Sequence, residues 1–509
     1  MAYIKEFQGY LIKDEEARES ISINTVSIDK LNGMVNGALI NVENGVDITD
    51  SFKDVYNSLD NETGGTIYIK SGEYIIRPLR IGNFVANEPN THNIEHLPDV
   101  KPLRIIGLGD VTLKLADNSN GDMFLFGSHD KGTYFENITF DGNNENQSFN
   151  PDICFWQGYQ TIILMFRCEN ITFKNCNFIN SNRFGLNASK DCYNVHVDGC
   201  KFENCHTPMD FIAHGCFINN VYISNTCVNG IYFESVERAE VDFNYLIGIN
   251  DNIVVENSKI ESQQNNIRTI WGTYNITIRN VIAKYISFDA SACGTNIGLK
   301  KGLIENCISE WIFVGNGKDV IIKDNIVTCG ASHPGININH SENIHITNNT
   351  AISDNSSIPV YLNGVRNKNI FVSNNDITSN STACLKIDYG DRYFINDNSM
   401  ITNYDYALFL DYPASNVHII NNILEANVRG VLKNRDGVTF SMKNNIGDGY
   451  TTPNIEPYVK FETVASLPTP SADYKNMVIV LSQLPNTQDA TPYFCSMKKD
   501  NTYEWKPLT

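Results

Sequence analysis

The sequence lacks several features that define common classes of protein. No run of about 18 apolar residues occurs, so no transmembrane helix is expected. The first 20 residues hold no apolar core typical of a secretory signal peptide. Metal-ligand spacings, a phosphate-binding glycine loop and a GxSxG motif are also missing. We therefore expect no metal, no cofactor and no insertion into a membrane.

Positive charge is scarce as well. The chain has 58 Asp and Glu residues against 39 Lys and Arg residues, and its formal net charge is −19. An acidic protein repels nucleic acid and anionic membrane surfaces, so neither is expected as a partner. The negative net charge does not exclude an acidic polysaccharide as a ligand, because a few Lys or Arg side chains can line a groove on an acidic protein.

Cysteine occurs 13 times, an odd number, without a CxxC pair. Several of these residues fall inside the repeats described next. We interpret them as small buried side chains in a reduced core, in preference to disulfides or metal ligands. A reduced core fits assembly in a cytosol.

One short phrase recurs between about Phe135 and Asn445. It reads Asn, apolar, any residue, apolar, and then a polar pair rich in Asn. Clear copies are 24 or 26 residues apart. Such copies begin at Asn170, Asn194 and Asn220, and again at Asp319, Asn343 and Asn369. A sustained period of this size indicates a solenoid.

The repeat unit is a strand, because apolar and polar residues alternate and Ile, Val and Phe dominate. A second short apolar run precedes each phrase by seven to eleven residues, so each coil carries two or three strands. The recurring Asn suits ladders of side-chain amides and a left-handed backbone at the turns. The predicted fold is all-β, a right-handed parallel β-helix.

Composition divides the chain into four parts. Residues 1–35 are polar and predict an adaptor or oligomerisation segment. The β-helix spans 36–450, and a Pro-containing linker follows at 451–464. Residues 465–509 read as a small β module for carbohydrate binding or trimerisation.

The β-helix opens with a predicted helix that Asp50 caps. Its apolar face consists of Phe52, Val55, Tyr56 and Leu59. Two strands split by a turn at Ser71 and Gly72 follow in the segment GGTIYIKSGEYII. A helix here would cover the open end of the solenoid.

This helix and the segment GGTIYIKSGEYII resemble the opening of the pectate-lyase-like β-helix superfamily, in the branch of bacteriophage tailspikes and appendage proteins. The specific sequence motif covers about residues 48–76, and the resemblance in overall architecture covers about residues 38–450. The resemblance implies a polysaccharide ligand, a homotrimer and attachment to a phage tail or baseplate through the N-terminal segment. It also implies a protein of the virion, assembled in the host cytoplasm and acting at the bacterial surface. It implies no particular reaction.

Strand alternation predicts which side chains point outward and share one groove. The predicted catalytic carboxyl groups are Glu234, Asp289 and Asp210. The predicted substrate-binding residues are His214, Tyr232, Arg268 and Trp271. Such a mixture suits glycoside hydrolysis, in which one carboxyl group donates a proton and a second acts as base or nucleophile.

The spacing of the acids suggests a stereochemical outcome. With one coil between them, Glu234 and Asp289 would be about 10 Å apart, near the inverting range. A polysaccharide lyase that uses the same groove remains an alternative. In it, His214 or Tyr232 would act as the base and Arg268 would neutralise a uronate. We favour hydrolysis over elimination.

Any single outward carboxylate on a solenoid is more often a solvated surface group than a catalyst. A second cluster of charged residues on later coils is a similar candidate for a site. It consists of Lys386, Asp388, Asp391, Arg392, Asp405 and Asp411. The residue set of polygalacturonases is not assembled, and only His214-Gly215 matches a fragment of it. The leading hypothesis is a phage tailspike that binds and depolymerises a capsule, exopolysaccharide or teichoic acid. Its rivals are a non-catalytic glycan-binding adhesion protein and a free-standing bacterial enzyme.

Overall fold

The computed structural model describes most of residues 37–447 and four short strands beyond them. Residues outside the description are 1–36, 41, 83–94, 98, 149–159, 227, 235–249, 271–272, 290–298, 405, 428, 434–437, 448–462, 465–477, 482–490, 498–502 and 508–509. The predicted adaptor at 1–35 and most of the predicted linker therefore lie outside it. Within the described part of the chain, no helix is long and apolar enough to cross a membrane.

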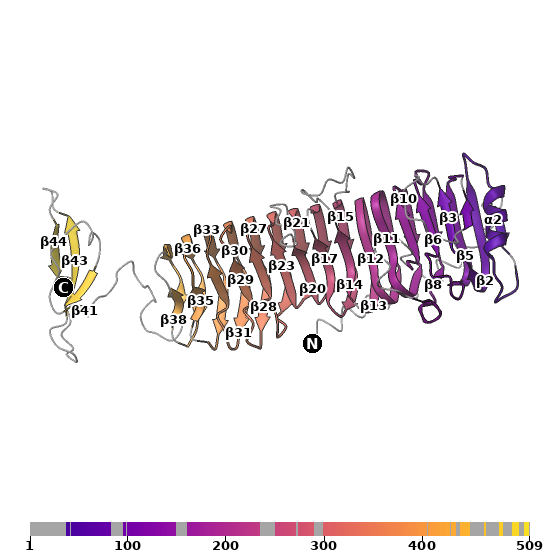
Figure 1. The fold of residues 1–509 in the computed structure, drawn as a ribbon. Helices are drawn as coiled ribbons and strands as arrows, with labels where there is room; N and C mark the ends of the chain where they lie inside the picture. Colours follow the sequence, from indigo (N-terminus) through magenta and orange to yellow (C-terminus); the bar gives the residue numbers. More distant parts are fainter. Residues whose placement is uncertain are drawn as a thin grey trace.

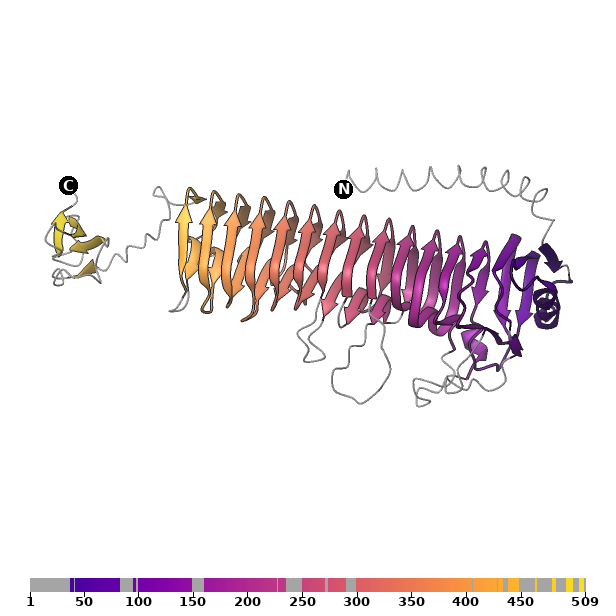
Figure 2. The same cartoon turned by 90° about the horizontal axis from the view of Figure 1, so that it is seen from above.

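The chain winds through stacked coils, and each coil adds one strand to each of three parallel ladders, here called sheets I, II and III (Figures 1 and 2). Sheet I contains β15 (Asn250–Glu256), β18 (Thr273–Arg279), β21 (Lys300–Glu305), β24 (Lys318–Lys323), β27 (Glu342–Thr347), β30 (Lys368–Ser373), β33 (Asp391–Asn396), β36 (Ser415–Ile420) and β39 (Phe440–Lys443). Sheet II contains β16 (Lys259–Ser262), β19 (Ile282–Ala283), β22 (Ile308–Ser309), β25 (Ile326–Thr328), β28 (Thr350–Ser353), β31 (Asp376–Ser379), β34 (Ser399–Thr402), β37 (Ile423–Glu425) and β40 (Ile446–Gly447). Sheet III contains β14 (Asn229–Glu234), β17 (Asn265–Ile270), β20 (Tyr285–Asp289), β23 (Trp311–Gly315), β26 (Ile336–Asn339), β29 (Val360–Asn363), β32 (Leu385–Asp388), β35 (Tyr406–Leu410) and β38 (Arg429–Lys433).

The earlier coils use some longer strands that continue through the corners. They are β1 (Gly37–Ile40), β2 (Gly65–Ile76), β3 (Leu79–Gly82), β4 (Glu95–Leu97), β5 (Leu103–Leu115), β6 (Phe124–Gly127), β7 (Thr133–Glu136), β8 (Thr139–Asp141), β9 (Ile163–Phe166), β10 (Glu169–Lys174), β11 (Asn177–Asp198), β12 (Lys201–Asn219) and β13 (Tyr222–Thr226), with a 3-10 turn η2 at Asn144–Asn146. Strand β12 pairs in turn with β13, β14 and β15, so it belongs to all three sheets.

The predicted helix is α2 (Thr49–Ser58), which lies at the N-terminal end of the stack (Figure 1). Phe52 and Tyr56 on its inner face are fully buried. The expectation that Asp50 caps it is wrong, because Asp50 lies inside the first turn and the residue at the cap position is Ile48, which has no polar side chain.

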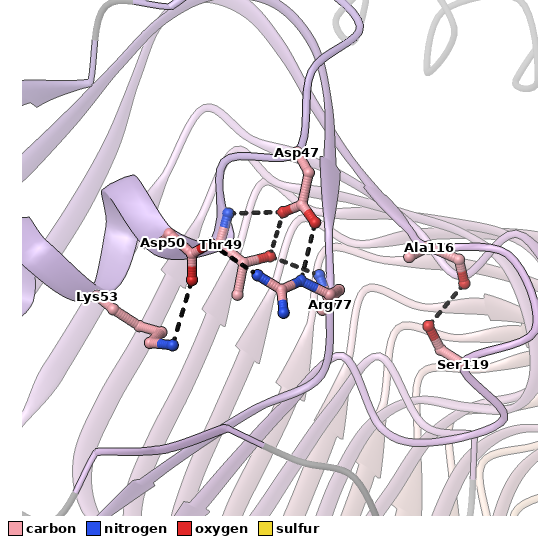
Figure 3. Close-up of polar contacts among 7 residues, drawn as sticks. All are labelled: Asp47, Thr49, Asp50, Lys53, Arg77, Ala116 and Ser119. Carbon is pink, nitrogen blue, oxygen red and sulfur yellow. Dashed lines mark hydrogen bonds and ion pairs between the residues drawn. The ribbon is translucent and has the colours of Figure 1, made fainter.

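Asp47 supplies the missing acceptor at this end of the helix (Figure 3). It accepts a hydrogen bond from the Thr49 N–H at 2.8 Å and one from Arg77 Nε at 2.8 Å. Arg77 also forms an ion pair with Asp50 at 3.1 Å, and its own N–H donates to Thr49 Oγ1. Because Arg77 directly follows β2, this network joins the start of the helix to the first coil.

Lys101 closes the other end of α2. Its ammonium group donates to the carbonyl oxygens of Tyr56, Asn57 and Leu59 at 3.0, 3.1 and 2.6 Å. The last turn of a helix leaves such carbonyl groups without partners, and the helix dipole favours a cation beside them. Lys101 is only 2% exposed, and these three bonds use all three of its donors.

The asparagine that begins each phrase has the left-handed backbone that the sequence predicts. Positive φ angles near 55° occur at Asn137, Asn170, Asn194, Asn220, Asn275, Asn343, Asn369 and Asn416, and at Asp319 in its copy. The side chains also form cross-coil amide bonds. Asn369 donates to Asn343 at 2.8 Å, and Asn343 donates to Asp319 at 2.9 Å.

A second amide ladder runs inside the C-terminal coils. Its members are Asn325, Asn349, Asn375, Asn398, Asn422 and Asn445. Each amide nitrogen except the last donates to the side-chain oxygen of the next member, and the same oxygen accepts the backbone N–H of the member before it. Each member also donates to a carbonyl oxygen of the preceding coil. The ladder therefore satisfies buried polar groups that the turns would otherwise leave unpaired.

Cysteine takes this turn position in earlier coils. The Cys307 thiol points to the carbonyl oxygens of Ile278 and Glu305, as the Asn349 amide does to those of Ile322 and Thr347. Nine cysteines whose side chains the structure describes are free and buried, as expected for small side chains of the core. The C-terminal strands β41 (Thr463–Val464), β42 (Val478–Leu481), β43 (Thr491–Met497) and β44 (Tyr503–Pro507) form a separate sheet.

We expect Asn375→Ala to destabilise the fold by on the order of 3 kcal/mol, because it leaves the Asn349 N–H and amide buried without their acceptor. Thermal unfolding followed by circular dichroism measures the loss. Asn380→Ala is the matched control, since Asn380 makes similar cross-coil bonds on the exposed surface. Equal shifts in the two variants would contradict a special role for the buried ladder.

Candidate functional site

Sheet III carries the predicted site, because its strands are the apolar runs that precede each phrase. Alternate side chains on these strands point outward. The parallel register stacks one outward position of every coil into a line, here called the floor column. Its members include Asp210, Tyr232, Arg268, Ser287, Phe313, Asn337, Tyr361, Lys386 and Phe409.

Three of the predicted site residues are neighbours in the floor column. Asp210, Tyr232 and Arg268 lie opposite one another on successive coils. Asp210 is only 9% exposed, and it accepts a hydrogen bond from the Asn187 side chain at 3.1 Å. Its carboxylate is therefore held by the preceding coil.

Glu234 and Asp289 share one register position, two residues after the floor column. Ile270 lies between them in the register, so one coil separates the two acidic positions, as predicted. At about 4.8 Å per rung the two backbone positions are about 10 Å apart. The side chain of Glu234 and the whole of Trp271 lie outside the described residues.

His214 does not belong to this groove, so its predicted place is wrong. The backbone of β12 turns a corner before His214, which pairs with Tyr193 and Asp251 and thus belongs to sheet I. Its ring stacks on Tyr193 at 4.7 Å, and its Nδ1 lies 3.0 Å from Asp251 Oδ1. Simple alternation along β12 fails here because it assumes one continuous face.

A hollow of about 400 Å³ opens on the outer face of sheet III. Three consecutive coils, those of β17, β20 and β23, supply most of its walls. Its lining residues are Gln263, Gln264, Asn265, Arg268, Tyr285, Ser287, Asp289, Trp311 and His333. Of the predicted site residues, the structure thus brings Arg268 and Asp289 together in one concave site.

Three aromatic rings form one side of the hollow. Trp311 and His333 stack at 4.4 Å, and the Tyr285 ring meets them edge-on at 6.0 and 5.7 Å. The indole Nε1 of Trp311 is buried and has no hydrogen-bond partner among the described residues. Trp311 was missed, although alternation in β23 signals its outward position. His333 lies in a loop, where alternation gives no orientation.

Two basic residues at the hollow, Lys284 and Arg268, differ in whether they pair with a carboxylate. Lys284 lies 3.5 Å from Glu310 and 5.2 Å from the centre of the Tyr285 ring, so this lysine is paired. Arg268 is half-buried, and its side chain makes no ion pair, hydrogen bond or ring contact with another described residue. Asp289 lies on the next coil but does not pair with it.

Another row of rings lies on the outer face of sheet I. His345, Phe371, Phe394 and His418 stack in order at 4.5, 4.8 and 5.3 Å. Each inner ring has both faces covered by its neighbours, so only ring edges meet solvent. A sugar binds to an exposed aromatic face, and this row therefore serves stability better than it serves binding.

Part of the second acidic cluster also converges, further along sheet III. Lys386 Nζ lies 3.2 Å from Asp388 and 3.0 Å from Asp411, and Tyr361 donates a hydrogen bond to Asp388 at 2.5 Å. Burial acts to lower the pKa of Lys386, but its bonds to the two carboxylates outweigh burial and raise that pKa. One lysine thus bridges the two carboxylates of this cluster and compensates part of their charge.

The remaining members of the second cluster lie elsewhere. Asp391 and Arg392 begin β33 on sheet I, where Asp391 accepts hydrogen bonds from Ser415 and Asn416. Asp405 lies outside the described residues. No group of three His, Cys, Asp or Glu side chains in the described part of the chain is placed to hold a metal ion.

Comparison with known families supports the fold. The family described as "Right handed beta helix region" matches residues 310–449. This stretch is a right-handed β-helix region. The match covers the coils with the buried Asn ladder. No curated protein sequence matches the chain.

Solved structures with a similar course of the chain have low identity to it. The mannuronan C-5 epimerase AlgE6 A-module of Azotobacter vinelandii is 11% identical over 80% of this chain and 97% of its own, with a TM-score of 0.40. PfbA, a surface adhesin of Streptococcus pneumoniae, is 13% identical over 91% and 95%, with a TM-score of 0.34. The catalytic domain of a GH87 alpha-1,3-glucanase is 12% identical over 81% and 69%, with a TM-score of 0.40.

We expect Asp388→Asn to lower stability by on the order of 2 kcal/mol, because it removes a buried charge that Lys386 and Tyr361 both bind. The thermal unfolding midpoint measures this effect, and Asp376→Asn on exposed sheet II is the charge-matched control. An unchanged midpoint with a loss of glycan binding would show instead that the cluster contacts ligand.

Proposed function

We propose that this protein binds a bacterial surface polysaccharide in the hollow on sheet III and cleaves it by glycosidic hydrolysis. The observation that carries the proposal is the combination of an open hollow of about 400 Å³ with an aromatic side and a polar floor. A sugar offers an apolar ring face and several hydroxyl groups. Trp311 and Tyr285 suit the ring face, and the amides of Gln263, Gln264 and Asn265 suit the hydroxyl groups.

Asp289 and Glu234 are the proposed reacting acids. Asp289 lies within the hollow, and Glu234 occupies the equivalent position two rungs away. One carboxylic acid protonates the departing glycosidic oxygen, and the other carboxylate takes a proton from the attacking water. A separation of about 10 Å between backbone positions leaves space for that water and favours inversion.

The placement of His214 weighs against a lyase. Elimination needs a base beside the sugar ring, and His214 is on sheet I, bound to Asp251. Tyr232 remains next to Arg268 in the floor column. Asp210 is held by Asn187 and does not line the hollow, so hydrolysis in this proposal depends on the other two acids.

The proposal places the protein in a bacteriophage particle as a tailspike that acts outside the host cell. It rests on the resemblance of residues 48–76, which fold as helix α2 followed by strand β2. Attachment to the tail through residues 1–35 and assembly as a homotrimer belong to the same proposal.

The test is incubation of the purified protein with capsule, exopolysaccharide and wall teichoic acid, followed by mass spectrometry of the released fragments. Hydrolysis adds one water per cleaved bond, whereas elimination leaves an unsaturated, ultraviolet-absorbing end. We expect saturated fragments, and a loss of at least roughly 100-fold in their rate of release with Asp289→Asn or Glu234→Gln.

Asp376→Asn is the control, because it removes one carboxylate from the outer face of sheet II. Its rate should equal that of the unmodified protein. Binding without any fragment would leave a non-catalytic adhesion protein. Unsaturated fragments would replace hydrolysis by elimination.

A further inference from the structure

Arg268 differs from other arginines of the described chain. Arg77 and Arg279 form ion pairs with carboxylates, and Arg104 lies over the Tyr134 ring. Arg268 has no such partner among the residues that the structure describes, although the chain is rich in Asp and Glu. Withdrawing a guanidinium group from water without a counter-charge costs free energy. An arginine kept half-buried and unpaired in a concave site therefore indicates a counter-charge supplied from outside.

The surroundings of Arg268 define where that counter-charge lies. The residue is in the floor column between Tyr232 and Ser287, and it opens into the hollow. The aromatic side begins one coil further on with Tyr285 and continues with Trp311. A sugar ring against the aromatic rings thus places its substituents within the same hollow as the guanidinium group.

We propose that the ligand is an anionic glycan, with a carboxylate or phosphate group bound by Arg268. This inference rests on the proposed function and adds the charge of the substrate. The guanidinium group presents a planar fork of donors that matches two oxygens of a carboxylate or phosphate. A neutral glycan leaves Arg268 without a partner and gains less from the site.

The structure also explains why a single residue controls this preference. Lys284, which lies over the Tyr285 ring beside the hollow, is already paired with Glu310. The protein as a whole is strongly acidic and repels an anionic polymer at long range. Attraction of an anion must therefore come from a local contact, and the described lining offers Arg268 for it.

Isothermal titration calorimetry with three probes tests the inference on the full-length protein. Tetragalacturonate carries carboxylates, its methyl ester has the same sugar chain without charge, and a glycerol-phosphate oligomer carries phosphates. We expect roughly tenfold or tighter binding of at least one anionic probe relative to the methyl ester. Whether the carboxylate or the phosphate probe binds better identifies the source of the anion.

Arg268→Gln should remove this preference, and Arg268→Lys should keep part of it, because lysine retains the charge without the fork. Arg279→Gln is the control, since it removes a cation from sheet I. The thermal unfolding midpoint of each variant verifies folding. Equal binding of charged and neutral probes, binding of no anionic probe, or an unchanged preference in Arg268→Gln would overturn the inference.

A failure of the proposed function would give a different pattern of binding results from a failure of the anionic preference. Trp311→Ala should weaken the charged and neutral probes alike, because it removes the aromatic surface. If tetragalacturonate and its methyl ester bind equally and Trp311→Ala weakens both, the glycan site stands and only the anionic preference fails. If Trp311→Ala changes nothing and no bacterial polysaccharide binds, the glycan site itself is refuted.

Discussion

The parallel stacking of coils at a fixed register is the constraint from which the rest of the structure follows. Rungs repeat at about 4.8 Å, and each side chain lies over its counterpart in the next coil. The buried ladder from Asn325 to Asn445 reinforces that register, since each amide is bound to the coil before and to the residue after it. A slip by one residue would break both sets of bonds and turn the apolar side chains toward solvent.

The same stacking explains how the candidate site is built. No single strand holds it: Arg268, Asp289 and Trp311 come from three consecutive coils and meet because those coils are in register. Rings placed on one ladder bury each other's faces, as Phe371 and Phe394 do. The rings of the hollow are arranged differently, because His333 stacks on Trp311 from a loop and the Tyr285 ring lies nearly perpendicular to both.

The sequence was sufficient to predict the solenoid, its turns and its core, because each depends on a local pattern repeated many times. The left-handed Asn residues and the outward position of Asp289 follow from that pattern. The site was predicted only partly, since corners and loops interrupt alternation. His214 follows a corner in β12 and therefore faces another sheet. Likewise, α2 begins one residue before Asp50, the predicted cap, and the side chain that accepts the first N–H of the helix is that of Asp47.

The network around α2 has a mechanical consequence. Backbone hydrogen bonds between coils run along the long axis, so a force spread over a whole coil loads all bonds of that interface together. A force on the chain end loads them one after another, and the outermost coil peels first. Arg77 and Lys101 tie both ends of α2 to the first coils. Tension entering from the N-terminal side therefore first separates β1 from β2 and must then break these contacts before it reaches the later coils.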